Sequence, residues 1–384
     1  MAEMSRKLHV LHIITGLDTG GAEMMLLKLV RRLNPSVNNF IIVLMERGTL
    51  SSQLDMHNVP VCYLGIRQGR FPNLNAIRKL INFARLSRPD VIQGWMYHGN
   101  LAAFLAKILL SPRTTLVWNV RQTLYEPENE KSLTGWVIKA CAKLSKIPER
   151  IIYNSSLSMV QHERIGFKKS SSLVIPNGFE LDIFKPDAEL RKQGRIKLNI
   201  PPDFLLIGHV ARFHPMKDHA TMFRAVRKVV DERCNTRFVF VGRQMNIRNA
   251  EVTALIEALK LEKYVILLGE RSDLNRIMNT FDLLVSSSAW GEGFPNVVGE
   301  AMATGIPCVV TDVGDSSHVV GEFGAVVPPA NSSILADTIL DVLASEEKSF
   351  KDLATQRRKR IASLFSAEQV SDSYLELYRK LKAE

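Results

Sequence analysis

The feature that most constrains the fold is an alternation that occurs twice along the chain. Short apolar runs rich in β-branched residues alternate with longer segments whose apolar residues recur with the period of a helix. This pattern is typical of α/β domains, in which helices connect parallel strands. A domain takes roughly 100 to 200 residues, and the chain has 384 residues. We therefore predict two α/β domains.

The predicted elements divide at a segment of turn residues. In the first half, strands are predicted at 9–14, 40–45, 61–64, 91–93, 115–119 and 150–154, and helices at 23–33, 76–87, 100–110 and 132–146. In the second half, strands are predicted at 205–209, 237–241, 265–268, 283–286 and 308–311, and helices at 219–231 and 296–304. Between the halves lie Pro176, Asn177, Gly178 and Pro186, which favour turns. We expect domains at 1–177 and 178–365 and a terminal helix in 366–384.

The positive charge is concentrated in the first half. The chain has 50 Lys and Arg against 39 Asp and Glu, a net charge of +11. Residues 1–177 hold 23 of the basic and 11 of the acidic side chains, which gives +12 there and −1 in the remainder. This asymmetry indicates that one half meets an acidic partner, such as a phosphorylated substrate, an anionic membrane surface or a nucleic acid.

Several classes of protein are disfavoured. The first apolar stretch has no small-residue cleavage site, so we interpret it as a strand and not as a signal peptide. The most apolar segment, 101–110, contains Lys107 and has about half of the ~20 residues that a spanning helix needs, so membrane contact is predicted to be peripheral. No CxxC pair occurs, which argues against disulfides or zinc and favours a reducing compartment. The four cysteines are Cys62, Cys141, Cys234 and Cys308.

Two loops that follow predicted strands suit phosphate groups. The first contains Gly20 and Gly21 before a predicted helix, whose N-terminus attracts anions. Ala22 follows where a nucleotide P-loop has Lys, which disfavours that motif. The second loop contains Arg212 and Lys217, a planar fork and a point charge that could clamp a diphosphate. By themselves, these loops are also explained by a tight turn and by solvated surface cations.

A longer motif supports a phosphate site. Segment 290–307 places Glu292 on a Gly/Pro loop and Glu300 in the helix that this loop opens. The loop N–H groups and the helix dipole would face the same space as Glu292, which suits a leaving phosphate beside a sugar. Glu300 could accept hydrogen bonds from vicinal hydroxyls. An E-x7-E spacing alone is common, but the surrounding GFPN and EAMATGIP make chance a poor explanation.

Taken in order, these motifs resemble the retaining glycosyltransferases of family 4 over nearly the full length. The resemblance rests on loop 16–23, GWMYHGN at 94–100, IPNGFELDIFKP at 175–186, Arg212 with Lys217, the E-x7-E block and VVPP at 326–329. It implies the GT-B fold, α/β with two Rossmann-like domains facing a central cleft. The N-terminal domain would bind the acceptor and the C-terminal domain the nucleotide-sugar, with the terminal helix packing back on the N-terminal domain. Ala211 departs from the Gly that the family often has there.

The resemblance also implies roles for single residues. Arg212 and Lys217 would bind the donor diphosphate, and Glu292 would contact the transferred sugar near its reacting carbon. His98 would lie at the cleft floor beside the sugar and the acceptor; the sequence around it is also explained by a structural histidine. Further donor contacts are implied for Glu300 at the ribose, Glu270 and Arg271 near the base, Gly20 and Gly21 at the diphosphate, and the backbone of Phe294, Pro295, Asn296 and Val297.

The chemistry expected of these groups is electrostatic. Breaking the bond between sugar and diphosphate develops negative charge, which Arg212, Lys217 and the helix beginning near Val297 would stabilise. No DxD pair is present, so no metal and no other cofactor are expected. Retention implies either a covalent intermediate, for which Glu292 is the strong candidate, or front-face attack. The sequence leaves both mechanisms open.

Two predicted helices of the first half combine cations with apolar residues. A basic amphipathic helix can lie on an anionic membrane, where each cation contributes about 1 kcal/mol; an ordinary solvated face would also explain the pattern. The +12 charge favours membrane attachment and a lipid-linked, phosphate-bearing acceptor. The cations are Arg78, Lys79, Arg85 and Arg88 in one helix, and Lys139, Lys143 and Lys146 in the other, beside Trp136.

The sequence thus predicts a metal-independent, retaining glycosyltransferase on the cytoplasmic membrane face. It would move a sugar from a nucleotide-sugar, with UDP preferred and GDP second, in α-linkage to a lipid-linked or polysaccharide acceptor of the lipopolysaccharide or capsule type. The alternatives are a sugar-nucleotide epimerase of the same architecture and, from another class, a basic nucleic-acid-binding protein. An NAD enzyme is disfavoured because GxGxxG is missing, and no nucleic-acid-binding motif is present.

Overall fold

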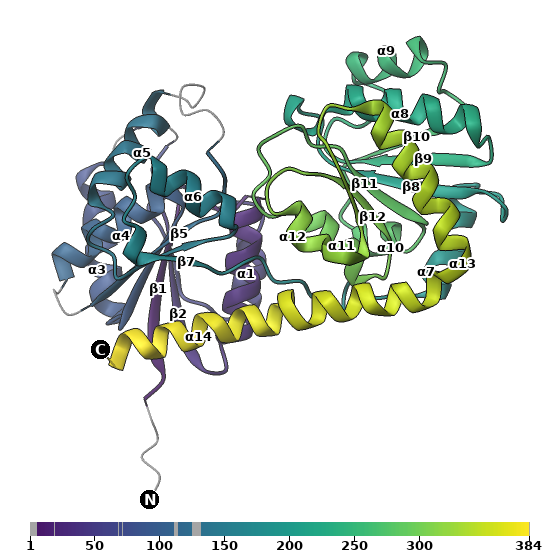
Figure 1. Cartoon of the computed structure of the whole chain (residues 1–384). Coiled ribbons are helices and arrows are strands. Elements are labelled where there is room, and N and C mark those ends of the chain that lie inside the picture. Colours follow the sequence, from purple (N-terminus) through teal and green to yellow (C-terminus); the bar gives the residue numbers. More distant parts are fainter. Residues whose placement is uncertain are drawn as a thin grey trace, which may run out of the picture. The chain divides into compact units, whose positions relative to one another are not determined.

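The chain divides into two compact units (Figure 1). The computed structural model describes residues 6–18, 20–67, 69–70, 72–110, 114–124 and 132–383, without the side chains of 132–133 and 346–352. Unit 1 consists of Met1–Gly178 and Ala367–Glu384, and unit 2 of Phe179–Ser366. Each boundary lies one residue beyond the boundary expected from the sequence. By sequence, unit 1 carries 26 basic and 15 acidic residues and unit 2 carries 24 of each, so the whole net charge belongs to unit 1.

The described strands of unit 1 form a seven-stranded parallel sheet in the order β3-β2-β1-β4-β5-β6-β7. β1 lies near the middle and pairs along its whole length with β2, Leu8 opposite Val37 and Ile14 opposite Val43. The chain proceeds outward in opposite directions from β1 and β4, which makes their carboxyl ends a topological switch point. The strands are β1 (Leu8–Ile14), β2 (Val37–Val43), β3 (Val61–Tyr63), β4 (Val91–Trp95), β5 (Thr115–Val120), β6 (Arg150–Tyr153) and β7 (Ser172–Val174).

Helices cover both faces of this sheet because its strands are apolar on both sides. One face packs against α1 and α14, and the other against α3, α4 and α5. The helices of unit 1 are α1 (Gly21–Leu33), α2 (Ser51–Met56), α3 (Leu74–Ser87), α4 (Met96–Leu110), α5 (Ser132–Leu144), α6 (Ser156–Arg164), the short 3-10 helix η1 (Lys169–Ser171) and α14 (Ala367–Ala383).

The terminal helix α14 lies beside α1 on unit 1 (Figure 1). Its apolar stripe is buried, with Tyr374 and Tyr378 fully inaccessible. The Tyr378 hydroxyl donates to Gln93 Oε1 on β4, and Asn119 Nδ2 on β5 donates to the Tyr374 hydroxyl at 2.8 Å. These bonds satisfy polar atoms that burial would otherwise leave without partners. The helix therefore completes the core of unit 1.

Unit 2 has a six-stranded parallel sheet in the order β10-β9-β8-β11-β12-β13, with its switch point between β8 and β11. Its strands are β8 (Leu205–Val210), β9 (Thr236–Val241), β10 (Val265–Gly269), β11 (Leu283–Ser286), β12 (Cys308–Thr311) and β13 (Ala325–Val327). Its helices are α7 (Ala188–Lys197), α8 (His219–Glu232), α9 (Ala250–Ala258), α10 (Leu274–Met278), α11 (Asn296–Ala303), α12 (Ser316–Val320) and α13 (Ser332–Phe365), with the 3-10 helices η2 (Pro215–Lys217) and η3 (Gly321–Phe323).

The predicted strands and helices are present, and three differences matter. β4 extends to Trp95 and α4 begins at Met96, so the prediction of a helix that starts only at 100 is wrong. β2 ends at Val43, two residues before the predicted end. The 34-residue helix α13 was not predicted, because its charged central part obscures the apolar period. Other elements without a prediction are the short strands β7 and β13 and the helices α2, α6, α7, α9, α10 and α12. All four cysteines are free.

Candidate functional site

The predicted site residues of unit 2 gather at the carboxyl ends of β8 and β11. The loop after β8 carries Arg212 and Lys217, and the loop after β11 carries Glu292. These strands are neighbours at the switch point of the sheet, where the outward course of the chain on either side leaves a crevice for ligands. The topology therefore brings together two loops that are far apart in sequence, because Lys217 and Glu292 are separated by 75 positions.

The central contact of the site is an ion pair between Lys217 Nζ and Glu292 Oε1. The two side chains are 19% and 13% exposed, so water screens the pair only weakly. Ser288 Oγ donates to the same oxygen at 2.8 Å, which fixes the orientation of the carboxylate. Among the described residues, no hydrogen bond or ion pair is made to Glu292 Oε2. Sequence reasoning missed Ser288, although it lies only two residues after the end of β11.

Backbone contacts hold the two loops against each other. The Ala289 N–H donates to the Met216 carbonyl at 2.9 Å. Gly291 has φ +76, a left-handed backbone conformation that favours glycine. A third loop, after β12, supports Glu292 from behind, because a Cβ at Gly314 would lie 2.4 Å from the Glu292 carbonyl oxygen.

A buried polar chain lies behind Lys217. Ser287 Oγ donates to the Lys217 carbonyl at 2.8 Å, so the hydroxyl proton is used and His209 Nε2 must donate to Ser287 Oγ, at 3.0 Å. Burial, then His219 and Lys217, lowers the pKa of His209 well below its ordinary value. Burial first, and then the Lys217 charge, lowers the pKa of His219 to about 4. Both histidines are therefore neutral at pH 7 and do not add charge beside the lysine.

Arg212 stands apart from the ion pair. Arg212 is exposed, and its Nη2 makes a weak contact with Met216 Sδ at 3.9 Å. The neighbouring His214 ring meets Trp290 edge-on at 6.1 Å. Burial, followed by the charges of Arg212 and Lys217, lowers the pKa of His214. The loop thus presents an accessible guanidinium beside a shielded ammonium.

The residues from Phe294 to Glu300 lead into α11 and form its first turn. Phe294 is 5% exposed and stacks on Phe179 at 5.9 Å, so its side chain belongs to the core and only its backbone is available to a ligand. Pro295 is the N-cap residue, and no side chain caps the helix. Asn296 and Val297 therefore open a helix N-terminus, with partial positive charge, and Glu300 is partly accessible one turn further on.

Glu270 and Arg271 lie at the edge of this arrangement. They follow β10, which is two strands from β8, roughly 10 Å at the usual spacing. Both residues are exposed. The Arg271 guanidinium forms a two-point bond with Asp273, at 2.9 and 2.8 Å. Arg271 is therefore already engaged by an acid of its own loop.

In unit 1, the predicted residues lie at the carboxyl ends of β1 and β4. Gly20 is the N-cap of α1, with no side-chain cap, and a Cβ on Gly21 would meet nothing within 4 Å. His98 lies in the first turn of α4, half-buried, and burial lowers its pKa. A Cβ on the adjacent Gly99 would lie 2.5 Å from the Ile13 carbonyl oxygen. Tight packing on β1 therefore fixes the position of His98.

Within the described residues, no group of three or more His, Cys, Asp and Glu side chains comes close enough to hold a metal ion. The described helices also include none that is long and apolar enough to cross a membrane.

Comparison with known families places the chain. Residues 19–183 match the model of Glycosyltransferase Family 4, and residues 204–345 match that of Glycosyl transferases group 1. The chain belongs to glycosyltransferase family 4. The resemblance seen in the sequence motifs is thereby confirmed, and the protein is a transferase enzyme.

Individual relatives of this family 4 enzyme are distant. EpsF of Bacillus subtilis, which is named as a glycosyltransferase, is 26% identical to this chain over 319 residues, or 80% of each chain. The UDP-Gal:alpha-D-GlcNAc-diphosphoundecaprenol alpha-1,3-galactosyltransferase of Escherichia coli is 26% identical over 210 residues, 53% of each chain.

Solved structures confirm the GT-B fold of this glycosyltransferase. HepE of Anabaena in complex with UDP has a TM-score of 0.83 and 21% identity, covering 97% of this chain and 100% of that chain. The same protein in complex with UDP-glucose has a TM-score of 0.81 and 22% identity, over 97% and 99% of the two chains.

Proposed function

We propose that this glycosyltransferase moves a sugar from a UDP-sugar, with a GDP-sugar as the second choice, to a lipid-linked or polysaccharide acceptor, with retention and in α-linkage. The observation that carries the proposal is the shielded pair of Lys217 and Glu292 at the switch point of unit 2. The UDP and UDP-glucose complexes of the HepE neighbour support the choice of nucleotide.

In this proposal, unit 2 binds the donor by charge. Lys217 and Arg212 hold the diphosphate, and the uncapped start of α11 faces the phosphate that departs. Such prepositioned charges stabilise a leaving group because they need not reorganise during the reaction. They would do so without a divalent metal, and no other cofactor is proposed. Glu300 would bind the ribose hydroxyls. Glu270 and Arg271 would lie near the base. Arg271 would break its bonds to Asp273 and bind the ligand instead.

Glu292 would act at the sugar. Lys217 and Ser288 both bind Oε1, which leaves Oε2 for the substrate. When the diphosphate binds Lys217, the ion pair would loosen and the carboxylate would face the positive charge that develops on the anomeric carbon. It would either form a covalent intermediate there or stabilise front-face attack. Both mechanisms are compatible with this geometry.

For the acceptor, we propose the switch point of unit 1. His98 would contact the sugar and the acceptor from the first turn of α4. Gly20 and Gly21 keep their role at the donor diphosphate, because the start of α1 would let a phosphate approach the backbone. The E. coli relative names a diphosphoundecaprenol acceptor, which supports a lipid-linked one here.

Attachment to an anionic membrane through α3, α4 and α5 is part of the proposal. These helices cover one face of the unit 1 sheet and expose large apolar side chains: Leu74 (74%), Leu86 (79%), Leu105 (51%), Ile108 (62%) and Trp136 (75%). The described cations on these helices include Lys79, Arg85, Lys139 and Lys143. Apolar groups that insert and cations that meet lipid phosphates are the two components of interfacial binding. The proposed location is therefore the cytoplasmic membrane face.

Replacing Leu105 and Ile108 together by serine is expected to weaken binding to anionic vesicles about thirtyfold, because each exposed apolar side chain contributes roughly 1 kcal/mol on insertion and the two together roughly 2 kcal/mol. Flotation with phosphatidylglycerol vesicles measures the bound fraction. Ile247→Ser is the matched control, because Ile247 is 80% exposed but belongs to unit 2. Equal binding by the double variant and the control would remove the membrane proposal.

The transferase proposal is tested by nucleotide binding and release. UDP should raise the melting temperature, as any ligand of the folded state does, and GDP should do so less. Free UDP should then appear from a UDP-sugar only when a membrane-lipid extract or a glycan acceptor is added. Conversion of the UDP-sugar without acceptor would favour the epimerase instead, and stabilisation by oligonucleotides alone would favour nucleic-acid binding.

A further inference from the structure

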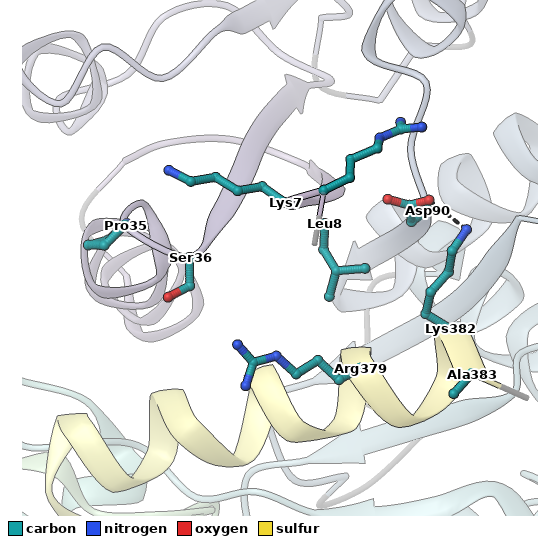
Figure 2. A pocket seen from close by; sticks show the side chains of 9 residues that line it. Lys7, Leu8, Pro35, Ser36, Asp90, Arg379, Lys382 and Ala383 are labelled. Carbon is teal, nitrogen blue, oxygen red and sulfur yellow. Dashed lines mark hydrogen bonds and ion pairs between the residues drawn. The ribbon is translucent and has the colours of Figure 1, made fainter. Parts of the chain in front are cut away.

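A basic pocket lies at the amino-terminal edge of the unit 1 sheet, the edge opposite to Gly21 and His98. It has a volume of about 630 Å³. Its wall comes from the segment before β1, from the turn between α1 and β2, from the start of β4 and from the end of α14 (Figure 2). The polar side chains in the wall are Arg6, Lys7, Ser36, Asp90, Arg379 and Lys382.

The acidic member of the wall is already engaged. Asp90 Oδ1 binds Lys382 Nζ at 2.7 Å, and Asp90 Oδ2 accepts the His9 N–H at 3.0 Å. Burial acts to raise the pKa of Asp90, but the His9 N–H and the charges of Lys382 and Arg6 outweigh it and hold the pKa below its ordinary value. The carboxylate is therefore ionised at pH 7 and neutralised by Lys382.

Three cations then remain in the wall. Within the described part of the chain, no acidic side chain forms an ion pair with Arg6, Lys7 or Arg379. Cations in the last turn of a helix are ordinary, because they offset the helix dipole, and this accounts for Lys382. It does not account for Arg6 and Lys7, which precede a strand. The three cations carry a charge of +3, which is more than the partial negative charge of about half a unit at each helix C-terminus can offset.

We propose that this pocket binds a phosphate group, carried either by a small phosphate compound in solution or by a phospholipid headgroup. The Arg379 guanidinium, which extends from α14 into the pocket (Figure 2), offers a planar fork to two phosphate oxygens, and Arg6 and Lys7 supply further charge. The Ser36 hydroxyl is an additional donor. The site goes beyond the proposed transfer reaction, because neither donor nor acceptor binding uses these residues.

The test compares two neighbouring cations of α14. Isothermal titration calorimetry measures the binding of inorganic phosphate and of pyrophosphate at an ionic strength held constant with chloride. Arg379→Gln should bind them about tenfold more weakly than the unmodified protein, because it loses a charge-assisted two-point contact. Lys380→Gln is the matched control, because Lys380 is exposed on the same helix outside the pocket wall and should change the affinity less than about twofold. The Lys217 site is intact in both variants, so any phosphate that it binds contributes equally to the two titrations.

Asp90→Asn should act in the opposite direction. The amide can still accept the His9 N–H, while Lys382 is released, so phosphate should bind more tightly. Vesicles of phosphatidic acid and of phosphatidylcholine then separate the two sources of phosphate. Loss in Arg379→Gln with dissolved phosphate indicates a soluble ligand, and loss only with phosphatidic acid vesicles indicates a headgroup. Equal loss in both α14 variants, or no binding of either probe, overturns the proposal.

Discussion

Replacing Lys217 by alanine is expected to lower kcat by about 10²- to 10³-fold, the usual loss when one prepositioned charge is removed from a developing anion. The ammonium is shielded, so its attraction to the departing phosphate would be stronger than in water. The substitution also removes the ion-pair partner of Glu292, whose carboxylate would remain oriented by Ser288 alone. Both effects raise the barrier for departure of the nucleotide.

The experiment measures the rate at which nucleotide is released from the donor when both donor and acceptor are saturating. Ser288→Ala leaves both charges in place and removes only the bond that orients Glu292, so its loss should be smaller, about tenfold. Lys228→Ala is the control, because Lys228 on α8 forms an exposed ion pair with Asp337 on α13. Turnover of the Lys217 variant within twofold of the control would exclude the diphosphate clamp.

Replacing Tyr378 by alanine is expected to lower the free energy of unfolding of unit 1 by about 3–5 kcal/mol, as for other large buried aromatic residues. The Tyr378 ring is fully buried between α14 and the sheet, so its removal leaves a cavity. It also leaves Gln93 Oε1 without the hydroxyl that donates to it. Both losses fall on the interface that holds the terminal helix.

The measurement is hydrogen exchange of β1 and β4 amides during urea unfolding, which follows unit 1 separately from unit 2. Tyr378→Phe keeps the ring and loses only the hydroxyl, so it should cost about 1–2 kcal/mol. Glu376→Ala, on the exposed side of α14, should be nearly neutral. A cost below 1 kcal/mol for Tyr378→Ala would show that α14 does not stabilise unit 1.

The sequence predicted much of the fold because two periods dominate it. The strands of both sheets are short and mainly apolar, and helices such as 219–231 have a clear apolar face, so their positions follow from burial. The long helix α13 escaped prediction, because the charged middle of Ser332–Phe365 breaks the apolar period although no Gly or Pro interrupts it. The start of α4 was not predicted either, because Gly94 and Gly99 suggest a loop. In the structure, these glycines allow close packing instead, Gly94 against Asn100 and Gly99 against Ile13.

For the candidate site, residue types and spacing named Lys217 and Glu292 but not their contact. Ser288, Ser287 and His209 carry no motif. They support the pair only because β8 and β11 are neighbours in the sheet and place them side by side. A hydrogen bond between residues 70 or 78 positions apart cannot be inferred from local patterns.

What the sequence determined by itself is the alternation of strands and helices, the order of the motifs and hence the family. It also located the excess of positive charge in residues 1–177. Only the tertiary structure decided which distant charges lie together. Docking of α14 brings Arg379 to Arg6 and Lys7 across more than 370 residues of chain, and with this helix unit 1 carries the whole +11 while unit 2 is neutral. The physical reason is that local patterns fix backbone conformation, whereas burial of the α14 apolar stripe selects its partner among distant surfaces.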